Sequence, residues 1–378
     1  MTGHRRKLRR PTRGGYLPPC CPNPHCSYHR HRHGWRFVRN GSFVRPSDHR
    51  RFRCFRCRHC GRRFSTRTFS STYWLRRRDL LRPTATLACE GAALRQIARA
   101  LGTSHPTVGR LLSRLGRHCL LFHTRLARDL VLAEPLVFDG FETYEFSQYF
   151  PFHLNLAVGA ESWFLYHFTD SPLRRKGAMT PLQRQRRADL ESALGRPDPK
   201  AIEHAIAALL APLLARCRRD HPLVLHSDDH PAYRRALRRL PPTVPLRHCV
   251  TPSRLRRTQS NPLFPVNLTD LLLRHGSANH HRESIAFSKR RQAALERAAV
   301  FMVWRNCIKR RRENGTRETA AMVAGCACRP LTWIDVLRRR LFPKQTRLPA
   351  PWPDYYWRRI KTAALGEGQT THAALYSY

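Results

Sequence analysis

Three carboxylates occur at positions where they could bind metal ions together. Asp139 and Asp228 each end an apolar, strand-like run, and Glu283 lies in a stretch of helical character that begins near Asn279. Carboxylates that are brought together repel one another unless cations share them. Oxygen ligands suit Mg²⁺ or Mn²⁺, and two such ions about 3.5–4 Å apart can activate an attacking hydroxyl and stabilise the leaving oxygen of a phosphodiester. The pattern therefore predicts a two-metal site at Asp139, Asp228 and Glu283 that cleaves phosphodiester bonds.

Neighbouring acids leave this assignment open, and a single aspartate at the end of a strand more commonly caps a turn. The competing residues are Glu142 and Glu145 for the first position, Asp229 for the second, and Asp270 and Glu296 for the third.

Glu283 is preferred as the third acid because of its neighbours on the expected helix. Asn279 lies four residues before it and Arg290 seven residues after it, which places all three on one helical face. Arg290 could therefore contact the DNA backbone. Alternatively, Arg290 and Lys289 simply form a solvated face.

The composition favours a polyanionic partner. Lys and Arg total 70 against 25 Asp and Glu, which gives a formal net charge of +45. Only seven of the 70 are lysines, and the excess of arginine is also what a GC-rich genome would produce without selection for binding. Nucleic acid is nevertheless the first expectation. The chain shows no secretory signal and no stretch long enough to span a bilayer, so we expect a bacterial cytoplasmic protein associated with the nucleoid and not with a membrane.

The cysteines near the amino terminus have the spacing of metal ligands. Six of the 13 cysteines fall within the first sixty residues, which is more typical of metal binding in a reducing compartment than of a disulfide framework. Two pairs, Cys21 with Cys26 and Cys57 with Cys60, predict a structural Zn²⁺ site with four thiolate ligands. Between the pairs, alternating residues predict a small β-ribbon with a hairpin turn at Asn40–Gly41.

Other side chains near these cysteines leave the zinc ligands open to revision. The first pair is loosely spaced, so Cys20 or His25 could replace one of its members, and Cys54 competes with Cys57. Four protein ligands would leave no coordination position free for catalysis, so the expected role of the ion is structural.

Residues 94–115 predict a helix-turn-helix. Apolar residues recur at helical spacing in two short segments, Gly102 separates the segments, and Pro106 suits the first turn of the second helix. The early residues of a second helix contact base edges in the major groove, where each good contact contributes about 1–3 kcal/mol of discrimination. The residues expected there are His105, Thr107, Arg110 and Arg114. A helical hairpin without DNA-binding function would show the same periodicity.

The remaining elements predict an α/β fold. Strand-like runs occur near residues 136–139, 153–158, 163–168, 223–228 and 246–250, with helical regions at 201–217 and 233–240 and a long one from Asn279. A stripe of apolar residues in that last region, near Leu295, is expected in the core. The segment between Asp228 and Glu283 is rich in proline and arginine, and the pattern assigns it no clear structure.

The order of these features resembles bacterial insertion-sequence transposases that carry an amino-terminal zinc ribbon, a helix-turn-helix and an RNase H-like DDE catalytic domain. The resemblance covers roughly residues 16–310 and depends on the four cysteines with Gly61 and Phe64, on the helices of 94–115, and on the segments that contain the three acids. It implies a zinc ribbon at 16–75, a helix-turn-helix domain at 76–130 and a catalytic domain at 131–312. That domain would be an RNase H-like mixed sheet with flanking helices.

The resemblance also implies an activity. Such an enzyme binds the terminal inverted repeats of its element, frees a 3′-hydroxyl at each end and joins it to target DNA, with Mg²⁺ or Mn²⁺ on the three acids and with multimers pairing the ends. Residues 313–378 form a basic and aromatic tail that could pack on the catalytic domain, bind DNA or support self-association. Two other functions fit the same features: a DNA-binding regulator that no longer cuts, and an RNase H-like nuclease such as a junction resolvase.

Overall fold

The computed structural model describes residues 16–217, 221–242, 244–281 and 284–365. The chain divides into two compact units, each built from two separate segments. One unit comprises Met1–Trp74 and Arg339–Gln345, and the other comprises Leu75–Arg338 and Thr346–Tyr378. A short piece of the carboxy-terminal region thus belongs to the amino-terminal unit.

A three-stranded antiparallel sheet forms the first unit, with β1 (Phe37–Val44), β2 (Arg51–Cys57) and β3 (Arg63–Ser65) in sequence order. The prediction of a hairpin turn at Asn40–Gly41 is wrong. The strand β1 continues through these residues, and its register with β2 shifts between Arg39 and Ser42. Gly41, at φ +75°, therefore serves a bulge within β1, which shares with a turn the need for a residue that tolerates positive φ.

The segment 339–345 completes the apolar core of this first unit. Phe342 is 6% exposed and packs in one cluster with the cysteines and with Phe55, Phe64 and Phe69. The backbone N–H of Arg340 donates to the Phe69 carbonyl at 2.8 Å. Part of the tail, for which we expected packing on the catalytic domain, DNA binding or self-association, therefore contributes a core residue to the first unit.

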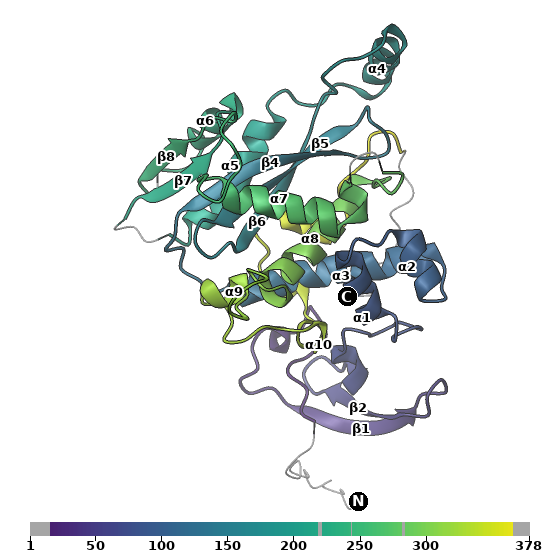
Figure 1. The fold of residues 1–378 in the computed structure, drawn as a ribbon. Coiled ribbons are helices and arrows are strands. Elements are labelled where there is room, and N and C mark those ends of the chain that lie inside the picture. The colour runs from purple at the N-terminus through teal and green to yellow at the C-terminus, as the bar shows by residue number, and fades with distance from the viewer. Residues whose placement is uncertain (1–15, 218–220, 243, 282–283, 366–378) are drawn as a thin grey trace, which may run out of the picture. The chain divides into compact units, whose positions relative to one another are not determined.

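Three helices begin the second unit: α1 (Leu81–Cys89), α2 (Leu94–Ala100) and α3 (His105–Leu126). Gly102 adopts φ +56° in the turn between α2 and α3, as its position predicts. Helix α3 continues well past residue 115 and packs against α8 (Arg291–Val303) (Figure 1). Gly116 allows this contact, because a Cβ there would lie 2.5 Å from the Glu296 carbonyl oxygen. The apolar stripe of α8 that begins at Leu295 is buried, as expected.

A mixed five-stranded sheet confirms the α/β prediction. Its strands are β4 (Leu136–Tyr144), β5 (Pro151–Gly159), β6 (Leu165–Pro172), β7 (Leu223–Ser227) and β8 (Leu246–Val250), in the order β6-β5-β4-β7-β8. The pairs β4–β5 and β5–β6 are antiparallel, whereas β4–β7 and β7–β8 are parallel.

Helices cover both faces of this sheet. On one face, α5 (Ala201–Leu214) and α6 (Pro231–Leu237) share a core with Leu136 and Phe138 of β4. On the other, α7 (Phe264–Gly276) crosses β4 and β5 (Figure 1). Arg274 of α7 lies over the Phe141 ring. Phe138 and Phe141 face opposite sides because side chains alternate along a strand. A further helix, α4 (Pro181–Leu194), contributes no buried residue.

The long helix expected from Asn279 does not form in the part of this region that the structure describes. In its place, η3 (Ala278–His280) forms a turn of three residues, and α8 begins only at Arg291. Ser284 explains part of the break, because its hydroxyl accepts from the Ala286 N–H and so satisfies the backbone outside a helix. Asn279 and Arg290 therefore do not share a helical face.

The rest of the chain is a series of short elements: the π-helix η4 (Trp304–Ile308), then α9 (Ala320–Val323), α10 (Trp333–Val336) and α11 (Trp352–Tyr356). Trp352 is 1% exposed and donates to the Phe168 carbonyl at 2.9 Å, so this part of the tail packs on β6. Nowhere in the described residues is there a helix both long enough and apolar enough to cross a membrane.

Candidate functional site

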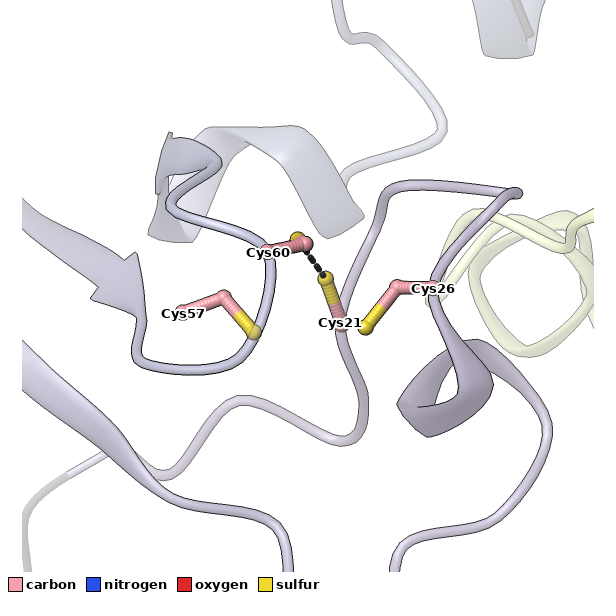
Figure 2. A group of neighbouring side chains, drawn as sticks. All are labelled: Cys21, Cys26, Cys57 and Cys60. Carbon is pink, nitrogen blue, oxygen red and sulfur yellow. Dashed lines mark hydrogen bonds between the residues drawn. The ribbon is translucent and has the colours of Figure 1, made fainter.

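The four cysteines predicted to bind zinc lie together. The Sγ atoms of Cys21, Cys26, Cys57 and Cys60 are all within 4.8 Å of one another, and those of Cys21 and Cys60 are 3.6 Å apart (Figure 2). Tetrahedral zinc with Zn–S bonds of about 2.3 Å requires sulfur atoms about 3.8 Å apart. This group could therefore hold a structural zinc ion with little rearrangement.

Local structure explains why these sulfur atoms converge. Cys57 ends β2, and the Gly61 N–H donates to its carbonyl at 3.0 Å with Gly61 at φ +70°, which folds Cys60 back toward Cys57. The indole Nε1 of Trp35 lies 3.3 Å from the Cys57 Sγ. Burial raises the pKa of Cys57, but hydrogen bonds from the Cys60 N–H and the Trp35 indole outweigh it and lower the pKa to about 7. This environment favours the thiolate at Cys57, whereas burial raises the pKa of Cys21 and of Cys26.

The alternative zinc ligands are not part of this group. Cys20 is buried, but its sulfur lies 3.0 Å from Nε2 of Gln345, in the segment that returns from the carboxy-terminal region. Cys54 and His25 are also absent from the cluster of ligand atoms. With four thiolates the site would be closed, so it offers a folding role and no position for a substrate.

Asp139 and Asp228 lie side by side on adjacent parallel strands. Leu136 pairs with Leu225, and Val137 pairs with His226. The same offset of 89 residues takes Asp139 to Asp228, one position beyond the end of β7. Both aspartates therefore stand at the carboxyl end of the parallel part of the sheet, where α/β proteins commonly bind ligands.

The environment of Asp139 disfavours the charged form of its carboxylate. Its Oδ1 accepts from the Gly140 N–H at 2.7 Å and from the Tyr233 hydroxyl at 3.0 Å. Burial and the charge of Asp228 raise the pKa of Asp139, and these hydrogen bonds oppose the rise only in part. Asp228 accepts from the His230 N–H at 3.0 Å. A bound cation would relieve the repulsion between the two carboxylates.

Asp270 is the third acid near this pair. It lies on α7, the helix that crosses β4, and its Oδ1 is buried with no hydrogen-bond partner among the described residues. Burial and the charge of Asp139 raise the pKa of Asp270 well above its usual range, although Arg274 and Arg257 act in the opposite direction. A buried carboxylate oxygen without a donor is what an absent cation would leave.

Glu283, the predicted third acid, lies outside the described residues. The competing acids have other partners. Glu142 has a largely exposed side chain 3.8 Å from His153, Glu145 accepts from the Arg291 N–H at 2.7 Å, and Glu296 accepts from Ser113 at 2.8 Å. Asp229 is exposed. Only Asp270 of the alternatives thus shares the environment of Asp139.

The described acids do not form a closed cage. Among the residues that the structure describes, the four cysteines are the only group of three or more potential ligands whose ligand atoms lie within 4.8 Å of one another. Asp139 and Asp228 at the sheet and Asp270 on the facing helix α7 would have to approach a cation from two sides. Their all-oxygen chemistry nevertheless suits Mg²⁺ or Mn²⁺.

Helix α3 presents part of the predicted DNA-contacting set. His105 and Arg110 are exposed and Thr107 is half-buried, and Arg110 donates to the Thr107 hydroxyl at 3.3 Å. Arg114 is only 6% exposed, since α3 is covered by other helices from about that point. Arg290 precedes α8 with an extended backbone and is half-buried.

Sequence patterns gave no role to Tyr233 and named Asp270 only as an alternative. Tyr233 is the third residue of α6, the helix that follows Asp228. An aromatic hydroxyl shortly after a strand-end acid can reach back across the sheet, and this pattern could have identified Tyr233. Asp270 had no such signal, because α7 itself was not recognised.

Comparison with known proteins adds no relative. No protein-family model matches this chain, and no curated protein matches it either. The function of the protein is therefore inferred from the charge of the chain, from the cysteine cluster and from the acids at the end of the sheet.

Proposed function

We propose that this protein is a DNA transposase of the zinc-ribbon, helix-turn-helix and RNase H-like DDE kind, which cleaves the ends of its own element and joins them to target DNA. The observation that carries the proposal is the position of Asp139 and Asp228, adjacent where the parallel pairing of β4 with β7 ends. The mixed sheet with helices on both faces supports the RNase H-like assignment.

In this proposal Asp139 and Asp228 hold Mg²⁺ or Mn²⁺ with a third acid, and the ions would activate the attacking hydroxyl and stabilise the leaving oxygen. Asp139 is oriented for this by the Tyr233 hydroxyl and the Gly140 N–H, which hold one carboxylate oxygen and leave the other for the cation. The raised pKa of Asp139 supports a site built for a positive ion.

Two residues are candidates for the third acid. Glu283 follows from the resemblance. Asp270 is favoured by its buried, unpartnered oxygen and by its electrostatic interaction with Asp139. If both contribute, Asp270 would be an additional ligand or would hold a proton beside the reacting phosphate.

The remaining features of the proposal concern DNA. A formal net charge of +45 supports binding to a polyanion. The exposed amino-terminal end of α3, with His105 and Arg110, would contact base edges of the terminal repeats, and Arg290 would contact the backbone. Pairing two ends implies a homo-oligomer on DNA, and the four-cysteine site would hold Zn²⁺ only to fold the ribbon.

The test uses DNA that carries the inverted repeats flanking the coding region. The full-length protein should nick this DNA at the repeat ends when Mg²⁺ or Mn²⁺ is added. Asp139→Asn should lower cleavage by at least about a thousandfold while binding to the same DNA stays within about twofold, because the loss removes a metal ligand and no DNA contact. Asp229→Asn, with the same loss of charge on an exposed neighbour, should cleave normally. Undiminished cleavage by Asp139→Asn would rule out the assignment.

A second candidate function is a DNA-binding regulator that does not cleave. The observation that favours it is that the described acids do not meet within 4.8 Å as the cysteines do. The same experiment separates the two functions, since a regulator would bind the repeats with full affinity and leave them intact with either ion.

A further inference from the structure

A cavity of about 780 Å³ lies in the second unit. The turn between β5 and β6, the first half of α7 and the segment after η4 surround it. Its walls combine rings with positive charge, and the residues that matter here are Trp163, His226, Phe264, Lys309, Arg311 and Arg312. Glu313 also lines the cavity and forms an ion pair with Lys309, so the arginines leave a positive excess.

Trp163 is held at this cavity in a backbone conformation that a bulky residue rarely adopts. Its φ is +60°, in the left-handed region that favours glycine. Glu134 fixes the turn, because its carboxylate accepts from the backbone N–H groups of Glu161 and Ser162, each at 2.8 Å. Strain of this kind persists only where surrounding contacts impose it, and it concentrates at functional sites.

Cations flank the Trp163 ring. The Cζ atoms of Arg311 and Arg312 lie 5.0 and 5.3 Å from its centroid, and the Phe264 ring meets it edge-on at 5.6 Å. Arg311 is fixed there by a hydrogen bond of 2.7 Å to the Glu161 carbonyl. An aromatic face beside guanidinium groups suits a flat ring that carries a phosphate.

The π-helix η4 holds the basic segment in place. Asn306 of η4 accepts from the Leu165 N–H and donates to the Leu165 carbonyl, both at 2.9 Å, and so occupies the backbone groups of β6. Such π-helical turns are rare and are frequent at functional sites. In this protein, η4 directs residues 309–312 to the turn that carries Trp163.

A polar atom in the cavity wall has no partner. Nδ1 of His226 is buried and makes no hydrogen bond with the residues that the structure describes. Because this nitrogen has no exposed surface, it would reach the edge of a nucleobase in the cavity only after the imidazole ring turns. Because His226 pairs with Val137, it stands two residues before Asp139 along the sheet. Leu268 and Leu272 of α7 also line the cavity, and Asp270 lies on the opposite face of that helix, because residues two positions apart on a helix point to opposite sides.

We propose that this cavity binds one unpaired nucleotide of a DNA strand, with the base on the Trp163 ring and its phosphate at Arg311 and Arg312. His226 of the cavity wall is two residues before Asp228, so a nucleotide held here would fix the DNA strand close to that acid. The inference goes beyond the proposed cleavage, since this binding requires neither a metal ion nor Asp139.

Binding of a labelled single-stranded oligonucleotide, followed by fluorescence anisotropy with the full-length protein at fixed salt and without added divalent cation, tests the proposal. An oligonucleotide of the same length in which every nucleotide is abasic keeps the phosphates and loses the rings. Trp163→Gly removes the ring and also relieves the positive φ, which offsets part of the packing lost with the half-buried ring. Trp74→Gly is the matched control, because Trp74 has φ +63° and is 64% exposed outside the cavity.

We expect Trp163→Gly to weaken binding of the normal strand about tenfold and to leave binding of the abasic strand unchanged. Trp74→Gly should match the natural protein with both strands. Equal affinity of the Trp163 and Trp74 variants for the normal strand would overturn the proposal.

Photo-crosslinking gives an independent result without any substitution. A strand containing 5-iododeoxyuridine should crosslink the natural protein at Trp163 or Phe264, located by mass spectrometry, and crosslinks found only outside the cavity would contradict the proposal. Failure here is distinguishable from failure of the proposed function, because Asp139→Asn should retain the crosslink whether or not the natural protein cleaves DNA.

Discussion

Replacing Asp270 by asparagine should make the metal-free protein more stable. The Asp270 Oδ1 atom is buried without a hydrogen-bond donor among the described residues, and burial together with the charge of Asp139 raises its pKa. Asparagine has nearly the same shape and no charge. Asp270→Asn therefore removes an unfavourable buried charge and creates no cavity.

The magnitude follows from the cost of a buried polar group without a partner, which is about 1–3 kcal/mol. Asparagine keeps one oxygen in the same place, so we expect a gain near the lower end, about 1 kcal/mol, or a rise in Tm of about 2–4 °C. The gain should depend on pH. A raised pKa means that the folded protein holds the Asp270 proton more tightly than the unfolded chain does, so ionisation of Asp270 lowers stability as pH rises through the raised value. The advantage of the variant should vanish below about pH 4, where both states of the natural protein are protonated.

Thermal unfolding from pH 4 to pH 8, with zinc retained and no other divalent ion, is the assay. Asp129→Asn is the control, because Asp129 is exposed and its loss changes the net charge equally. In the natural protein, Mn²⁺ at about 100 times its Kd should add about 2.7 kcal/mol of stability, and Asp270→Asn should lose most of that gain if Asp270 is a ligand. If the variant is less stable than the natural protein at pH 8, then the buried Asp270 carboxylate does not lower stability.

Two further predictions concern the first unit. Cys57→Ser, or removal of zinc with a strong chelator, should unfold the ribbon, seen as loss of one zinc per chain and early proteolysis before residue 75, because so small a core depends on the metal. Phe342→Ala should destabilise the same unit by about 3–5 kcal/mol and weaken zinc retention. Leu255→Ala, at an exposed residue, is the control and should leave zinc bound. Unaltered zinc retention in Phe342→Ala would show that the first unit does not need segment 339–345 to hold the ion.

Local patterns in the sequence were sufficient to predict the cluster of four cysteines and the neighbouring positions of Asp139 and Asp228. Cys57 and Cys60 share one tight turn, so their spacing alone defines half of the site. Asp139 and Asp228 were recognisable because each follows a run of apolar residues, although β4 continues past Asp139 to Tyr144 and only Asp228 lies beyond the end of its strand. Such relations need only a few neighbouring residues.

Helix α7 and its Asp270 could not be recognised in the same way. Pro265 in the first turn of α7 is compatible with a helix but reads as a break in the chain. Thr269 occupies a buried position where an apolar residue would have shown the periodicity, and its hydroxyl bonds to the Pro265 carbonyl at 2.8 Å. The return of Phe342 to the ribbon is a contact between distant parts of the chain, which no local pattern indicates.

Anomalous diffraction from crystals soaked in Mn²⁺ would show whether Asp139 and Asp228 bind divalent cations. We expect one or two anomalous peaks within about 2.5 Å of carboxylate oxygens of Asp139 and Asp228, about 3.5–4 Å apart if both ions bind. No peak should appear there in Asp139→Asn crystals. Saturating Mn²⁺ without any peak beside these two aspartates in the natural protein would contradict the account.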